Sequence, residues 1–151
     1  MLNRRVVETD ENGQITKEYS YKVDDNVIVF NKDRNFIKLF TSQLKKLKKK
    51  VSQTETLILL DLTHYISYES GMLTKTGEND SRYPLTNKDI EKITEFSPGV
   101  VIKSMIHLVD VGVFARTKVG KNYIYFANPF IFCKGVKINK TLIDMFKKFR
   151  N

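Results

Sequence analysis

The strongest structural signal in this 151-residue chain is a pair of helix starts placed close together. Thr86 and Asp89 have the spacing of a capping box, in which a hydroxyl and a carboxylate each accept a hydrogen bond from the other residue's backbone N–H. They begin a short helix, TNKDIEKI. A tight connection over residues 94–96 then leads to Ser97 and Pro98, an N-cap followed by proline at the first helical position. The pattern predicts two helices joined by a short turn.

A basic hairpin is predicted directly after these helices. The second helix, VVIKSMIHLVDV, stops at Gly112, where a left-handed C-terminal cap favours glycine. Two strand-like segments follow, VFARTK and YIYFAN, separated by the turn-forming residues 119–122. Helix, short helix, capped helix and basic hairpin together predict a winged helix-turn-helix within an α+β fold.

The N-terminal third predicts a hairpin and an amphipathic helix. RRVVET and QITKEYSYKV alternate apolar and polar residues on either side of a turn containing Asn12 and Gly13. NVIVF, residues 26–30, is a third short strand or an entry into the next element. From Asn35 the period becomes helical, and this helix ends in the basic run KKLKKK at 45–50. Its stripe is Phe36, Phe40, Leu44 and Leu47, widened by Ile37.

The rest of the chain predicts a buried helix, a loop and a terminal helix. Ser52 and Glu55 have capping-box spacing ahead of TLILLDLTHYISY, so a central, mostly buried helix is expected. Residues 69–84 are polar and predict a long loop or an irregular hairpin. After FIFCKG comes an amphipathic helix that docks on the core or on a second subunit, with a stripe of Leu142, Met145, Phe146 and Phe149.

We expect these segments to form one compact unit with three parts. Residues 1–34 form an N-terminal β-hairpin extension and residues 35–136 the winged helix-turn-helix. Residues 137–151 form the C-terminal amphipathic helix.

The net charge and the cysteine count limit the partners and the kinds of site that this chain can have. The chain has 26 Lys and Arg against 17 Asp and Glu, a formal net charge of +9, which favours phosphate-rich or otherwise acidic partners. Cys133 is the single cysteine, which excludes an internal disulfide and a Cys-rich zinc cluster. No stretch approaches the roughly 20 apolar residues that span a bilayer. We therefore expect a cytoplasmic protein that uses no membrane, metal or other cofactor.

The second helix and the hairpin supply the expected DNA contacts. Helical spacing turns Val101, Ser104 or Met105, and Leu108 inward. Lys103 and His107 are then candidate donors to base edges. The full set of expected DNA-binding residues is Ser97, Gly99, Val100, Lys103, His107, Arg116, Lys118, Lys121 and Asn122. The hairpin residues form a cationic face suited to a phosphate backbone or a minor groove.

Apolar residues of the second helix and lysines elsewhere in the chain are also expected to contribute to binding. Val100 and Ile102 suit thymine methyl groups. Ile102, Ile106 and Val109 form a stripe that we expect to bury against the terminal helix or a partner chain. Non-specific affinity through counterion release is expected from the lysines at 45, 46, 48, 49, 50, 134, 137, 147 and 148.

Two stretches of the chain resemble known sequences. SPGVVIKSMIHLVDVGVFART resembles the frame of bacterial winged-helix recognition helices, with Ser97, Val101, Leu108 and Gly112 at the matching places. YFANPFIFCKG, an aromatic strand leading into Asn-Pro-aromatic and Lys-Gly, resembles the plasmid and phage replication protein family RepL. The resemblance covers most of residues 10–136. It implies that the chain initiates plasmid or phage replication by recognising duplex DNA. We expect this DNA to be the origin region and the chain to recruit host replication proteins there. The chain departs from the winged-helix frame just after the N-cap, where Pro98, Gly99, Val100 and Ile102 replace the usual polar residues.

Three alternatives remain open at this stage. A transcriptional repressor of the same fold differs only in where its site lies. An origin-nicking enzyme would use Tyr65 or Tyr68, placed one helical turn apart, but His64 and His107 do not have the spacing of its paired metal ligands. An interaction module would use the Ile102, Ile106 and Val109 stripe and bind no nucleic acid. We expect a non-catalytic protein that dimerises on DNA through this stripe and the terminal helix.

Overall fold

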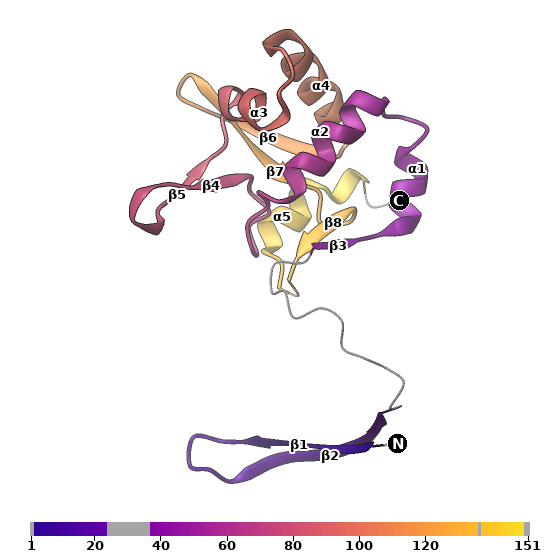
Figure 1. Ribbon diagram of the computed structural model, residues 1–151, viewed down its shortest axis with the longest axis vertical. Helices are drawn as coiled ribbons and strands as arrows, with labels where there is room; N and C mark the ends of the chain where they lie inside the picture. The colour runs from indigo at the N-terminus through magenta and orange to yellow at the C-terminus, as the bar shows by residue number, and fades with distance from the viewer. Residues whose placement is uncertain (1, 24–36, 136, 150–151) are drawn as a thin grey trace. The chain divides into compact units, whose positions relative to one another are not determined.

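The computed structural model describes residues 2–23, 37–135 and 137–149, and Figure 1 shows the elements that they form. Contacts divide the chain into two units, residues 1–34 and residues 35–151, in place of the one compact unit expected from the sequence. The C-terminal segment groups with the second unit. The predicted third strand at residues 26–30 lies outside the described residues.

The first unit contains an antiparallel hairpin of β1 (Leu2–Thr9) and β2 (Ile15–Val23), which confirms the predicted N-terminal hairpin. The Asp10 carboxylate holds the turn by accepting a hydrogen bond from the Asn12 N–H at 2.9 Å. Gly13 has φ +77°, a conformation that costs glycine little because it has no Cβ.

The second unit is a mixed α+β structure of short helices and small antiparallel sheets. Its described elements are β3 (Ile37–Leu39), α1 (Thr41–Leu47), α2 (Gln53–Thr63), β4 (Thr74–Thr76), η1 (Glu78–Asp80), β5 (Arg82–Pro84), α3 (Asn87–Thr94), α4 (Pro98–Asp110), β6 (Phe114–Val119), β7 (Asn122–Ala127), β8 (Phe132–Lys134), α5 (Lys140–Met145) and η2 (Lys147–Phe149). Strand β3 pairs with β8, β4 with β5, and β6 with β7.

The core of this unit forms where α2, α3 and α4 contact one another and α4 contacts β6. Each helix contributes one apolar face, as amphipathic helices do. The inward set predicted for α4 is confirmed, because Val101, Ser104, Met105 and Leu108 are all buried. The largest side chains with almost no exposure include Ile58, Leu62, Ile90, Phe114, Tyr125 and Phe132.

The segment predicted as one helix from Asn35 is a strand followed by a shorter helix. Strand β3 pairs with β8, with Leu39 opposite Phe132, and α1 begins only at Thr41. The helical spacing holds from the N-cap residue Phe40 onward. Periodicity could not show that β8, far along the chain, offers a strand edge to β3, so the prediction over β3 was wrong.

Helix α2 confirms its predicted start and corrects its predicted extent. The Ser52 hydroxyl accepts from the Glu55 N–H at 3.2 Å, and the Glu55 carboxylate accepts from the Ser52 N–H at 2.7 Å. The helix ends at Thr63, before the tyrosines of TLILLDLTHYISY. Its burial is one-sided, because Leu57 and Leu60 are 54% and 49% exposed. The prediction of a mostly buried helix was therefore wrong.

The C-terminal segment packs on the core of its own chain. Leu142 and Phe146 are buried. A Cβ placed on Gly112 would collide with the Phe149 ring, and one on Gly71 would collide with Leu142. Gly112 also has φ +81°, which confirms the predicted left-handed cap after α4. Of the two positions predicted for the terminal helix, the structure has the one on the core.

Candidate nucleic-acid interface

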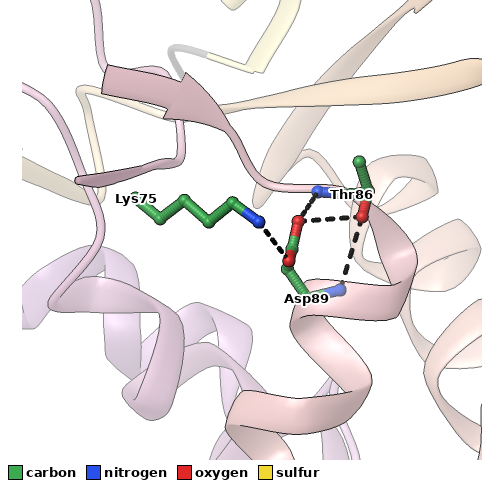
Figure 2. Close-up of polar contacts among 3 residues, drawn as sticks. All are labelled: Lys75, Thr86 and Asp89. Carbon is green, nitrogen blue, oxygen red and sulfur yellow. Dashed lines mark hydrogen bonds and ion pairs between the residues drawn. The ribbon is translucent and has the colours of Figure 1, made fainter. Parts of the chain in front are cut away.

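The start of α3 is closed by side chains. The Asp89 carboxylate accepts from the Thr86 N–H at 2.9 Å and from the Thr86 hydroxyl at 2.8 Å, and Lys75 on β4 donates to it at 2.5 Å (Figure 2). Burial alone would raise the pKa of Asp89, but the hydrogen bonds from Lys75 and Thr86 outweigh it and lower that pKa. The predicted capping box is confirmed, and the Lys75 ion pair with the same carboxylate ties the irregular hairpin β4–β5 to α3.

The start of α4 is open. Ser97 has the extended backbone of an N-cap and Pro98 stands at the first helical position, as predicted, but the Ser97 side chain makes no capping hydrogen bond. Ser97 and Gly99 are exposed. A Cβ built on Gly99 would meet nothing within 4 Å. The first N–H groups of a helix have no partner inside the helix and carry partial positive charge, so this open end favours an anion.

The exposed face of α4 is cationic and apolar. Lys103 is exposed beside Ile102 and Ile106, which are 45% and 39% exposed. Within the described residues the terminal helix does not cover this apolar stripe, because only Val109 of the three packs against the core, and burial against a partner chain stays a prediction. Asp110 is exposed at the far end of the helix, so the part of the face that suits DNA is its N-terminal half.

His107 is held by a buried carboxylate. Its Nδ1 lies 2.7 Å from Oε1 of Glu55, and the Glu55 side chain is 10% exposed. Burial alone would raise the pKa of Glu55, but hydrogen bonds from Ser52 and His107 lower it. One ring nitrogen of His107 is thus occupied inside the protein, which leaves Nε2 for any DNA contact. No local pattern predicts this pair, since its residues lie 52 positions apart.

The hairpin β6–β7 carries the remaining predicted residues. Gly120, with φ +61°, and exposed Lys121 form the two-residue turn between Val119 and Asn122. Arg116 and Lys118 lie on one face, because alternate residues of a strand share a face.

The predicted DNA-binding residues of the hairpin do not all share one outward face. The Arg116 guanidinium lies 4.4 Å from the centre of the Tyr123 ring, which orients it across the hairpin. Asn122 pairs with Val119, so it belongs to the opposite face from Arg116 and Lys118. Lys118 and Lys121 are exposed near the tip, whereas Arg116 is half-buried.

Buried side chains fix the helix pair to the hairpin. The hydroxyl of buried Tyr125 on β7 donates to Oδ1 of Asn87, at the start of α3, at 2.7 Å. Asn128 donates to the Gly112 carbonyl at 2.7 Å, and its Oδ1 accepts from the Phe130 N–H at 2.9 Å. The Asn-Pro-aromatic motif of the resemblance thus has a structural role, because it joins the end of β7 to the turn after α4.

The residues of the nicking alternative are not arranged as predicted. Tyr65 and Tyr68 follow the end of α2 rather than lying one helical turn apart. The His64 ring packs edge-on against Tyr65, with ring centroids 5.5 Å apart. Within the part of the chain that the structure describes, no three His, Cys, Asp or Glu side chains are grouped so as to hold a metal ion.

Among the described residues, no helix is both long enough and apolar enough to cross a membrane.

Comparisons with known proteins find little. No family model matches the chain, and no curated protein matches it. Among solved structures, the chain is similar to the type III plasmid segregation protein TubR at 11% identity and a TM-score of 0.36, over 82% of this chain and 93% of that chain. The resemblance to the RepL family therefore stands on its motifs alone.

Proposed function

We propose that this chain is a winged helix-turn-helix protein that binds double-stranded DNA in a sequence-specific manner. In this proposal α4 lies in the major groove and the hairpin β6–β7 is the wing. The observation that carries it is the open, exposed N-terminal half of α4 on a helix pair that is fixed to a basic hairpin. No catalytic step and no cofactor enter the proposal.

The contacts of α4 divide into positioning and recognition. The free N–H groups at its start, beside Ser97 and Gly99, suit a phosphate, because helix N-termini attract anions. Lys103 suits a guanine edge or a second phosphate. The exposed methyl groups of Val100, Ile102 and Ile106 suit thymine methyl groups, so the preferred site is expected to contain A·T pairs.

The wing supplies affinity that depends on salt. Lys118 and Lys121 extend from the hairpin tip, where each can neutralise a phosphate and release its counterions. Arg116, stacked on Tyr123, has a more fixed direction than a free arginine and suits a minor groove.

The finer role that we propose is initiation of plasmid or phage replication in the cytoplasm. The aromatic-Asn-Pro motif at residues 126–130 and the Lys-Gly pair that follows it support this role through their resemblance to the RepL family. The protein would mark or open an origin, bind it as paired copies and recruit host replication proteins. A transcriptional repressor is the second candidate, because it would use the same interface.

The test is a selection of duplex fragments that include the protein's own coding region, followed by binding of the winners and of a random duplex over a salt series. We expect one sequence to be enriched and to bind at near-physiological salt far more tightly than the random duplex. A map position at an origin supports the initiator and one at a promoter supports the repressor. Equal binding of both duplexes, lost together as salt rises, would contradict sequence-specific binding.

A further inference from the structure

A groove of about 710 Å³ lies between α1 and α2. Its walls are mostly leucine, including Leu39, Leu44, Leu57 and Leu60. Three of these, Leu39, Leu57 and Leu60, are more than two-fifths exposed. Contiguous exposed apolar surface of this kind marks a binding site more often than a random feature of a surface.

The groove lies away from the candidate DNA interface. Glu55 faces α4, where it binds His107. Leu57 and Leu60 follow Glu55 by two and five positions, and at about 100° per residue both are turned to the far side of α2. A ligand in the groove would thus leave the exposed face of α4 free.

The charge among the residues that line the groove has one sign. Lys48, at the C-terminal end of α1, lines the groove, and none of the residues that line it is acidic. The run to which it belongs, residues 45–50, holds four other exposed lysines. Lys48 places positive charge at the edge of this apolar surface, which favours an acidic partner over a basic one, whereas Lys46 and Lys50 line a separate pocket.

We propose that this groove binds an amphipathic helix of a partner protein, with apolar residues at i, i+3 or i+4, and i+7 and acidic residues beside them. Apolar grooves between helices bind peptides in this mode. A second copy of this chain fits less well, because a two-fold interface brings the same surface together from both subunits and the lysine runs would face each other. The proposal does not depend on DNA binding.

The experiment is a selection from a displayed library of amphipathic helical peptides, with leucine fixed on one face and Glu or Lys varied at random on the other. The target is the full chain. The winners are then measured against L57Q/L60Q, which keeps good helix formers at exposed positions, and against K48E. The matched control is I15Q, which makes a similar change at an exposed apolar residue of the first unit.

We expect Glu-rich winners whose affinity falls about tenfold or more in L57Q/L60Q, falls severalfold in K48E and is unchanged in I15Q. Absence of winners, winners without a charge preference, or winners that bind L57Q/L60Q as tightly as the parent chain would overturn the proposal. Sedimentation adds a further outcome, because a dimer present in the parent and lost in L57Q/L60Q would give the groove to a second copy instead. Duplex DNA binding should be the same in L57Q/L60Q as in the parent chain, so failure here and failure of the proposed function are distinguishable.

Discussion

The two consecutive helices α3 and α4 begin in opposite ways. At the start of α3, Thr86 and Asp89 satisfy each other's backbone N–H groups, and Lys75 adds an ion pair to the same carboxylate. At the start of α4, Ser97 stands in the N-cap position but its side chain makes no capping bond. The first start therefore has a side-chain cap that contributes stability, whereas the second has none, and its positive end is the part of α4 that the proposed DNA contact would use.

Alanine substitutions at the two helix starts should differ most in their effect on stability. We expect Asp89→Ala to lower the free energy of unfolding by about 1–2 kcal/mol, because two bonds to Thr86 and one to Lys75 are lost. Ser97→Ala should lower it by less than about 0.5 kcal/mol, since no side-chain bond is lost. Urea denaturation of the two variants measures both values, and equal losses would contradict the comparison.

An acidic residue at the start of α4 should affect the stability of the chain and its affinity for DNA in different ways. Gly99→Asp places a carboxylate in the first turn of α4, in space that no other atom occupies. The helix dipole favours that charge, so stability should stay the same or rise by up to about 1 kcal/mol. Affinity for duplex DNA should fall about tenfold, because the carboxylate repels phosphate.

Gly99→Asn is the matched neutral control for this prediction. It should bind DNA more tightly than Gly99→Asp. If both variants bind as the parent chain does, the start of α4 does not contact DNA.

The stability of the chain should depend on pH through Asp89 at the start of α3. The pKa of Asp89 in the folded chain is lowered by its partners, so its contribution is complete above the ordinary aspartate pKa of about 4 and is lost as the pH falls through the lower folded value. Glu55 adds a loss of the same sign, because its pKa is lowered too. The difference in unfolding free energy between the parent chain and Asp89→Ala should therefore shrink between pH 5 and pH 2. Denaturation at several pH values checks this, and a constant difference would contradict it.

The smallest effect is expected at the hairpin tip. Lys118→Ala removes one positive charge at an exposed position, so little packing should be lost. Affinity should fall only severalfold, for selected and random duplex alike, and the slope of log affinity against log salt should fall by about one. An unchanged slope would mean that Lys118 does not contact phosphate.

The sequence predicted what depends on neighbours along the chain and missed what depends on distant ones. Both capping boxes, the Gly112 cap and the inward face of α4 follow from local spacing, and all are confirmed. Strand β3 forms by pairing with β8, almost a hundred residues later in the chain. The helical spacing of its residues therefore led to a wrong prediction.

Two features of the candidate site were also beyond local spacing. The Glu55 and His107 pair is formed by two helices that meet only in the fold. Ile102 and Ile106 are exposed in the single chain, because helical spacing predicts an apolar face but not which segment covers it. The DNA contacts themselves remain a prediction for every site residue.

The most direct test of DNA binding through α4 and its hairpin compares two triple variants that remove the same charge. K103A/K118A/K121A removes lysines from α4 and the hairpin, and K48A/K49A/K50A removes lysines from the run after α1. Affinity for the selected duplex, measured over a salt series, should fall by tenfold or more in the first variant and only slightly in the second. Equal losses in the two variants would mean that overall charge binds the DNA, and would contradict a specific interface at α4.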